Sequence, residues 1–444
     1  MSSSNLFFST FLLLLTISSI AKAVVPVENQ FHFTNDLGMV DDYAAEYGST
    51  FIATSISTSP FQLFFYNTTP NAFTLALGMG QTITGSLLRW VWEANRGNPV
   101  GRGSNLTLGA DGNLVLADAD GRLAWQTHTA NKGIVGFSLL PTGNMVLYDS
   151  NGSYVWQSFD HPTDTLLASQ YLKPSSPNSR LVSRASALEN KDGLYTLVLE
   201  NDGIVLHYQS PNSATKKYTY YSYASQFLYL NKSPVKQVTF VAIGETEEHY
   251  AAYYLMWRYM TNRNDIGDVV LARPKYNVTL SFLRLGIDGS VKIHTYDDRE
   301  GSAGWEETYS LFSRGGGESE CQLPERCGKR LGLCEDNQCV ACPLESGLVG
   351  WSASCEAQKV PLEACGKKAF GYYEVVGVDH FMSGYSRGDA TSEGGCGGKC
   401  SSDCKCLGYF YWREEGKCWL AYDLMTLRRV ADSTHVGYIK VPTK

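Results

Sequence analysis

Short stretches in which apolar and polar residues alternate run through the segment from about residue 48 to residue 165. They are separated by four glycine-containing dipeptides, Asp111-Gly112, Asp120-Gly121, Thr142-Gly143 and Asn151-Gly152. Alternation with a period of two is typical of half-buried strands, and glycine supplies the positive φ that two-residue hairpin turns require. The pattern therefore predicts small antiparallel sheets built from hairpins.

The same segment repeats itself. Residues 112–116 read Gly-Asn-Leu-Val-Leu and residues 143–147 read Gly-Asn-Met-Val-Leu, an offset of 31 that Trp125 and Trp156 also keep. A looser copy precedes them, with Trp92 lying 33 residues before Trp125. Self-similarity at a fixed period indicates stacked or radially arranged units. We predict a three-sided prism of sheets in which the three indoles face a shared axis and fill the core.

Residues 166–312 have the pattern of a second, more diverged all-β unit. Asp202-Gly203 and Asp288-Gly289 each place a turn before an alternating strand, and tyrosines recur between residues 218 and 223. Aromatic residues favour strands, so we interpret these tyrosines as strand-forming. Phenolic cross-linking in an extracellular matrix is the alternative that the sequence leaves open.

All 12 cysteines lie in the last 124 residues, after the glycine run 315–317, and they form two sets of six. The first set is Cys321, Cys327, Cys334, Cys339, Cys342 and Cys355, and the second is Cys365, Cys396, Cys400, Cys404, Cys406 and Cys418. Six cysteines in a short segment predict a small module held by three disulfides, for which 15 pairings exist. Metal binding through the close cysteine spacings is the less favoured alternative, since no histidine lies nearby. We expect no metal and no cofactor.

Residues 1–23 have the pattern of a secretory signal peptide. An apolar run of about 15 residues ends in Ala-Lys-Ala, which fits a cleavage site. No other stretch has the roughly 20 apolar residues that a membrane span needs. In a secreted chain, five Asn-x-Ser/Thr motifs are candidate glycosylation sites: Asn67, Asn105, Asn151, Asn231 and Asn277. The net charge of −7 excludes a basic footprint for nucleic acid.

Two long blocks carry a family resemblance. Residues 89–100 (Arg-Trp-Val-Trp-Glu-Ala-Asn-Arg-Gly-Asn-Pro-Val) and 156–167 (Trp-Gln-Ser-Phe-Asp-His-Pro-Thr-Asp-Thr-Leu-Leu) are similar to signature blocks of plant bulb-type lectin domains in S-locus glycoproteins and their receptor kinases. With no membrane helix and no kinase, the chain looks most like the soluble epidermis-specific secreted glycoproteins of plants.

The resemblance implies an all-β architecture of two tandem β-prism (bulb-type lectin-like) domains followed by disulfide-rich EGF-like and PAN/apple-like modules. The expected domains are residues 24–165 (bulb-type lectin), 166–314 (second β-prism), 315–360 (EGF-like) and 361–444 (PAN/apple-like). It also implies that disulfides close within each cysteine-rich module.

Bulb-type lectins bind mannose through the strand motif Q-x-D-x-N-x-V-x-Y, which presents amide, carboxylate and phenol groups to the sugar hydroxyls. The first candidate keeps Asp111, Asn113 and Val115, with Gly109 and Ala117 in place of Gln and Tyr. Asp-Gly-Asn also builds hairpin turns without any sugar.

The second candidate for a mannose strand keeps Asn144, Val146 and Tyr148, with Leu140 and Thr142 in place of Gln and Asp. In the second prism, the positions held by Asn201, Gly203, Val205 and His207 keep almost nothing of the motif. Because each lost partner removes a hydrogen bond, we expect mannose binding to be absent or very weak.

No catalytic signature stands out. The histidines are scattered, and neither H-E-x-x-H nor G-x-S-x-G occurs. Asp160, His161 and Asp164 could suggest acid–base chemistry, but Pro162 makes this segment a turn of the lectin-type block. We therefore do not expect an enzyme.

The resemblance implies a secreted glycoprotein of the plant cell wall or apoplast that binds wall glycans or glycoproteins, with a suggested role in limiting water movement through the epidermal wall. The alternative is a receptor-ectodomain-like protein that binds a secreted peptide or another ectodomain. We expect no nucleic-acid partner and no membrane span, and dimerisation by strand exchange stays open.

Overall fold

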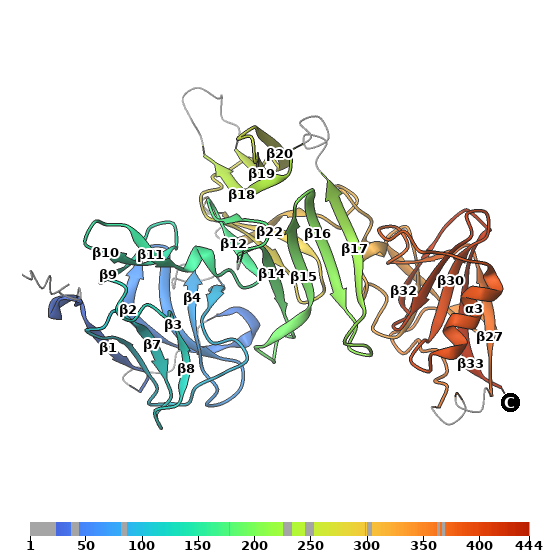
Figure 1. Cartoon of the computed structure of the whole chain (residues 1–444), viewed down its shortest axis with the longest axis horizontal. Coiled ribbons are helices and arrows are strands. Elements are labelled where there is room, and N and C mark those ends of the chain that lie inside the picture. The colour runs from blue at the N-terminus through green and yellow to red at the C-terminus, as the bar shows by residue number, and fades with distance from the viewer. Residues whose placement is uncertain are drawn as a thin grey trace, which may run out of the picture.

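The computed structural model describes residues 24–36, 44–80, 87–176, 178–224, 233–244, 253–297, 299, 304–361, 365 and 369–443. The predicted signal peptide 1–23 and the Asn231 glycosylation motif lie outside the described residues. Three lobes built largely of β-strands follow one another along the long axis (Figure 1). The predicted all-β fold class is confirmed. Among the described residues, no helix is long and apolar enough to cross a bilayer.

The first lobe is a prism of three antiparallel sheets. One has the order β1-β6-β7-β8 (Phe31–Thr34, Asn105–Leu108, Leu114–Ala117, Leu123–Gln126). The second has the order β2-β3-β4-β5 (Thr50–Thr58, Phe61–Asn67, Thr74–Met79, Arg89–Glu93), and the third the order β11-β10-β9 (Tyr154–Gln157, Met145–Asp149, Ile134–Leu139). Short 3-10 helices precede β1 (η1, Val27–Asn29), precede β2 (η2, Glu46–Gly48) and follow β11 (η3, Ser158–Asp160).

One indole from each sheet meets its two counterparts at the centre of this prism. Trp92 lies 5.8 Å from Trp125 and 6.3 Å from Trp156, measured between ring centroids, and Trp125 lies 5.8 Å from Trp156. All three pairs are edge-on, with interplanar angles of 74–78°, the geometry that the quadrupoles of aromatic rings favour. The predicted shared axis is confirmed.

The hairpins form as predicted, but the expectation of two-residue turns is wrong. The backbone pairs that close three of them, Asp118 with Arg122, Leu140 with Asn144 and Asp149 with Ser153, enclose three residues each. In these loops a turn is followed by a glycine with positive φ, such as 86° at Gly121 and 83° at Gly143. Three-residue hairpin loops use glycine in this last position, so the same residue signals both loop lengths.

The second lobe repeats the prism with three four-stranded sheets. Their orders are β12-β21-β22-β23 (Thr165–Leu167, Ser281–Leu285, Val291–Asp297, Gly304–Ser310), β13-β18-β19-β20 (Tyr171–Leu172, Val235–Ile243, Tyr254–Thr261, Ile266–Ala272) and β14-β15-β16-β17 (Arg180–Arg184, Asp192–Glu200, Gly203–Gln209, Lys217–Ala224). β12 spans the predicted domain boundary at residue 165 and already pairs with the second prism.

The third lobe contains both cysteine-rich segments. One sheet has the order β26-β25-β24-β32-β28 (Gly347–Gly350, Gln338–Leu344, Leu331–Glu335, Met425–Arg429, Val378–His380). Another has the order β27-β33-β30-β31-β29 (Phe370–Val376, His435–Pro442, Gly408–Trp412, Lys417–Ala421, Asp389–Ala390), with helix α3 (Glu393–Ser402) in contact with β30 and β31. The 3-10 helix η4 (Glu320–Gln322) leads into this lobe.

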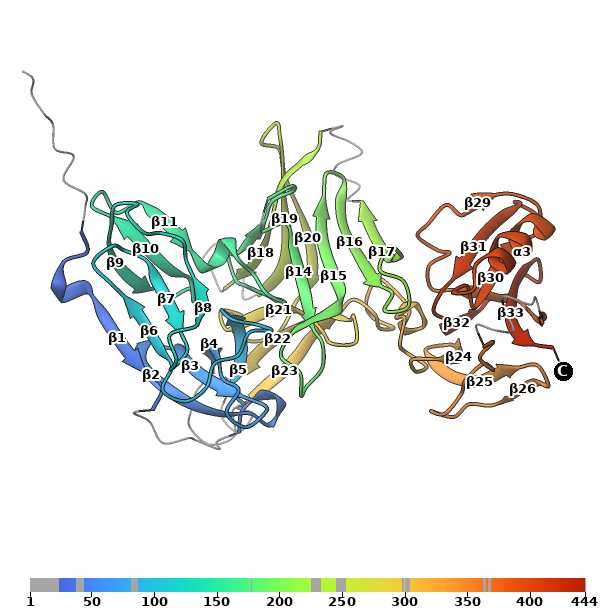
Figure 2. The same ribbon diagram turned by 60° about the horizontal axis from the view of Figure 1, so that its bottom comes forward.

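The predicted EGF-like and PAN-like segments share one sheet, because β24 pairs in parallel with β32 (Figure 2). Six disulfides join all twelve cysteines: 321 with 334, 327 with 339, 342 with 355, 365 with 404, 396 with 418, and 400 with 406. Each pair closes within its own half, as the resemblance implies. The sulfur atoms that the metal alternative requires therefore all belong to disulfides.

Candidate functional site

The mannose-motif positions of the first repeat lie in the hairpin that joins β6 to β7. Leu114 and Leu116 of β7 belong to the prism core, so Asn113 and Val115 point to the opposite face of the sheet. Asp111 is exposed in the turn, where its carboxylate accepts the Asn113 backbone N–H at 3.0 Å. Val115 is half-buried.

Most hydrogen-bonding groups of the Asn113 side chain have partners within the protein. It is buried, and its amide nitrogen donates to the Gln126 side-chain oxygen at 2.7 Å. Its amide oxygen accepts the Thr129 backbone N–H at 3.1 Å and the Thr127 hydroxyl at 3.2 Å. Asn113 therefore ties the hairpin turn to the end of β8 and to the segment that follows it, and these bonds occupy both acceptor positions of the amide oxygen and leave one buried amide N–H.

Asn144 makes the same contacts one repeat later. Its amide nitrogen donates to the Gln157 side-chain oxygen at 2.9 Å, and its oxygen accepts the Phe159 backbone N–H at 3.2 Å and the Ser158 hydroxyl at 3.3 Å. The repeated Asn, with the Gln and the Ser/Thr that follow it 13 and 14 positions later, thus braces the hairpin in the same way twice.

The other positions of the second repeat are also packed. Val146 is 1% exposed. The Tyr148 ring lies over Gly136, where an added Cβ would come within 2.4 Å of the phenol oxygen. In the second prism, burial lowers the pKa of His207 to about 4, and this ring contacts the Thr219 hydroxyl at 3.1 Å.

The four described glycosylation candidates differ in exposure. Asn151 lies exposed in the β10–β11 turn, and Asn277 is exposed before β21. Asn67 and Asn105 are half-buried in strands, and their side-chain oxygens accept hydroxyl hydrogen bonds from Thr50 and Thr34. The first pair offers the freer side chains.

The charged residues of the two signature blocks lie between the prisms. Arg96 contacts Glu93 at 2.6 Å and Asp164 at 2.9 Å, and all three side chains are at most 7% exposed. The second prism adds Arg184 from β14, 3.3 Å from Glu93 and 1% exposed. It also adds Arg284 from β21, which donates to Glu46 of η2 at 2.5 Å.

A tryptophan and a phenylalanine of the second prism complete this junction. The Trp305 indole N–H donates to the Leu87 carbonyl oxygen at 2.7 Å. Within the first prism, the Trp92 indole N–H donates to the His161 carbonyl oxygen at 2.8 Å. Phe282 of β21 is fully buried in the core of the first prism. Figure 2 shows β4 and β5 lying against β21–β23, so the prisms share buried charges as well as core.

Sequence reasoning missed this junction. Glu93, Arg96 and Asp164 stand inside the signature blocks and pair with one another. The partners from the second prism, Arg184 and Arg284, belong to no motif. Charges this deeply buried occur where they are paired, and charge content alone does not reveal partners that lie 91 and 238 residues away along the chain.

The Asp160-His161-Asp164 group has a structural role. The His161 ring stacks on Trp156 with centroids 5.6 Å apart, and burial lowers its pKa. The Gln157 amide donates to Asp160 at 2.9 Å. Burial alone would raise the pKa of Asp164, but the Arg96 and Arg284 guanidiniums outweigh it and hold that pKa below its usual value.

Comparison with known proteins agrees with this geometry. The family model described as D-mannose binding lectin matches residues 89–187, which contain both signature blocks. With its prism and its three central indoles, the first lobe is of the bulb-type lectin class.

Relatives extend over most of the chain. EP1-like glycoprotein 3 of Arabidopsis thaliana is 45% identical over 95% of this chain and 94% of its own length. The epidermis-specific secreted glycoprotein EP1 of Daucus carota is 50% identical over 80% of this chain and 93% of its own. The chain belongs to the family of EP1-like, epidermis-specific secreted glycoproteins.

A more distant relative is named as a receptor-like kinase. The G-type lectin S-receptor-like serine/threonine-protein kinase SD2-5 of Arabidopsis thaliana is 24% identical over 80% of this chain and 41% of its own length. The match to the S-locus type that the signature blocks predict thus covers more than the first prism.

Proposed function

We propose that this protein is a secreted glycoprotein of the plant cell wall or apoplast that associates with wall glycans or glycoproteins without a working mannose site on its motif strands. It is not an enzyme. The name of its carrot relative supports secretion, and the bulb-type lectin match supports carbohydrate as the ligand class. A role in limiting water movement through the epidermal wall follows from the family resemblance.

The observation that carries the proposal is the state of Asn113 and Asn144. Each amide that would face a sugar already donates to a glutamine and accepts from a backbone N–H. A sugar hydroxyl that donates to either amide oxygen must displace one of these bonds, so the exchange yields little net free energy.

A glycan and wall-polysaccharide screen of the purified glycoprotein tests both parts. We expect no titratable binding of free mannose below about 1 mM, together with retention on at least one wall polysaccharide. Submillimolar mannose binding by calorimetry, lost in Asn113→Ala while the protein stays folded, would contradict the mannose part. Failure to bind any wall fraction would contradict the ligand class.

The second candidate is a receptor-ectodomain-like binder of a secreted peptide or protein, favoured by the match to a receptor kinase over 80% of the chain. Extraction separates the two. A wall-associated protein should leave the wall only in high salt or detergent, whereas an ectodomain-like protein should elute in a mild wash together with a protein partner. Size-exclusion chromatography with light scattering would test whether the chain dimerises, which the sequence leaves open.

A further inference from the structure

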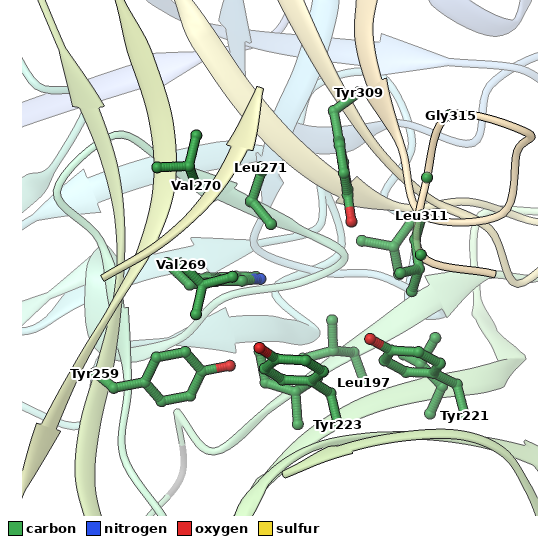
Figure 3. Close-up of a pocket in the computed structure, with 16 residues that line it drawn as sticks. Leu197, Tyr221, Tyr223, Tyr259, Val269, Val270, Leu271, Tyr309, Leu311 and Gly315 are labelled. Carbon is green, nitrogen blue, oxygen red and sulfur yellow. The ribbon is translucent and has the colours of Figure 1, made fainter. Parts of the chain in front are cut away.

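The second prism holds a partly open cavity of about 250 Å³ between its sheets. Its lining comes from strands of all three sheets, and the glycine run 315–317 that follows β23 completes it. Figure 3 shows the side chains around this space. In the first prism three indoles fill the interior, whereas here Trp257 is the single indole of the lining and four tyrosines stand around a space.

The phenols of Tyr221, Tyr223, Tyr259 and Tyr309 turn their hydroxyl ends toward the same space (Figure 3). Two of them, Tyr221 and Tyr223, come from β17. A register shift in the β16–β17 ladder pairs Leu206 with Tyr221 and His207 with Thr219, so no residue of β16 lies opposite Tyr220. The shift allows Tyr220 and Tyr221, neighbours in sequence, both to be buried. The tyrosine-rich strand therefore supplies core and cavity wall together.

Tyr259 is the residue that indicates a ligand. Its side chain is 0% exposed, and its hydroxyl has no hydrogen-bond partner among the described residues. An unpaired buried hydroxyl destabilises a fold by the desolvation of that group, and an acceptor bound in the cavity would supply the missing partner. Burial raises the pKa of Tyr259 well above its usual value, so the phenol stays protonated and able to donate.

The remaining lining defines the chemistry of that occupant. Among the described residues that line the cavity, none carries a charge, and aliphatic side chains such as Leu197, Val269 and Leu271 form the walls. Such walls disfavour an ion, because nothing there compensates its loss of hydration. An engineered cavity of about 150 Å³ holds benzene, so about 250 Å³ suits one ring with a short substituent.

We propose that this tyrosine cavity binds a neutral small molecule with a single aromatic ring and a carbonyl or ether oxygen, and that the Tyr259 hydroxyl donates to that oxygen. The proposal is independent of the carbohydrate function, because it concerns the interior of the second prism and uses none of the motif strands.

Acetophenone is a suitable probe, because it carries one ring and one carbonyl. α-Methylstyrene has the same shape without the acceptor, and benzoate has the same ring with a charge. For the secreted full chain, we expect calorimetry or thermal shift to detect acetophenone with a Kd of about 1 mM or tighter. Benzoate should bind at least tenfold more weakly. Absence of acetophenone binding at a ligand concentration of about 10 mM, tenfold above the expected Kd, would overturn the proposal. Equal affinities for benzoate and acetophenone would also overturn it.

Two variants place the ligand. Tyr259→Phe should weaken acetophenone about three- to tenfold and leave α-methylstyrene unchanged, with a melting temperature equal to or above wild type because an unpaired hydroxyl is removed. Val269→Phe on the edge strand β20 should fill the space and abolish both shifts. Tyr154→Phe, at a side chain 53% exposed on β11, is the matched control. An equal loss of both ligands in Tyr259→Phe, or no loss of acetophenone, would contradict the assigned role of Tyr259.

Discussion

Single residues in this protein owe their roles to their surroundings more than to the motifs that contain them. Asn113 and Asp111 belong to the same mannose motif. The Asn113 amide is buried and makes three hydrogen bonds, whereas the Asp111 carboxylate is exposed in a turn. The motif predicts sugar ligands, whereas the contacts of Asn113 stabilise a hairpin.

The Asn113→Ala variant should lower the free energy of unfolding of the first prism by about 1–3 kcal/mol, because Thr129 and Gln126 lose buried partners. Asp111→Ala removes one exposed bond and should change it by less than about 1 kcal/mol. Urea denaturation of both variants measures the difference. Equal losses would mean that the Asn113 contacts contribute nothing beyond the turn.

Burial of His380 should make the free energy of unfolding depend on pH at values above those at which carboxylates titrate. It is fully buried against Phe381 and Phe410, and burial lowers its pKa to about 3. The unfolded chain binds this proton near pH 6.5, so stability is full above that pH and falls as pH drops toward 3.

A pH series of melting temperatures between pH 7 and pH 4.5 measures this dependence. His380→Gln should reduce the pH dependence of the free energy of unfolding by up to one proton. The glutamine can still donate to the Asp423 carbonyl oxygen that His380 contacts, but the absolute stability should fall. An unchanged slope in the variant would assign the pH dependence to other groups, His207 and His294 first.

At the scale of elements, the first prism depends on the meeting of its sheets. A three- or four-stranded sheet of short strands buries one face only, and β5, β8 and β11 each contribute one indole to the common centre. Large aromatic side chains supply most of the apolar area that such a small core requires.

Truncation of Trp92 tests this dependence. Trp92→Ala should destabilise the first prism by about 3–5 kcal/mol, since it leaves a large cavity and removes the bond to the His161 carbonyl oxygen. Trp351→Ala, at a side chain 41% exposed, is the control and should be near neutral. Chemical denaturation followed by fluorescence reports both. A loss below about 1 kcal/mol in Trp92→Ala would contradict the shared core.

For the whole molecule, the lobes join through buried contacts. The charges of Glu46, Glu93 and Asp164 are compensated by arginines from both prisms. On the other side, Tyr208 and Tyr218 of the second prism pack edge-on to Phe381 at 6.0 and 5.9 Å between ring centroids. Both junctions are therefore packed interfaces and not flexible linkers.

Glu93→Ala should therefore weaken the contact between the two prisms. It leaves Arg96 and Arg184 buried without this carboxylate, and removal of one partner from a buried pair costs about 3–5 kcal/mol. The two prisms should then separate more readily, so limited proteolysis near residues 165–190 should accelerate. Glu189→Ala, in an exposed pair with Lys191, should leave the cleavage rate unchanged. Identical rates in both variants would contradict the role of the buried charges.

How much of this structure the sequence predicts depends on the range of each interaction. The hairpins around Gly121 and Gly143 and the common orientation of Trp92, Trp125 and Trp156 follow from local periodicity and a 31-residue repeat, which act over short stretches. The pairing of the cysteines within each half follows from the resemblance. The domain limits stay predictions, since β12 crosses one boundary and the β24–β32 pairing crosses another.

The sequence by itself determined the strand pattern, the repeated core and the family, because these depend on residue type and spacing. Only the tertiary structure decided that Asn113 and Asn144 brace hairpins, that Arg184 and Arg284 pair with charges of the first prism, and that Tyr259 lines a cavity between the sheets of the second prism. Each of these depends on which distant residues come into contact, and the free energy of a buried polar group is set by its partner.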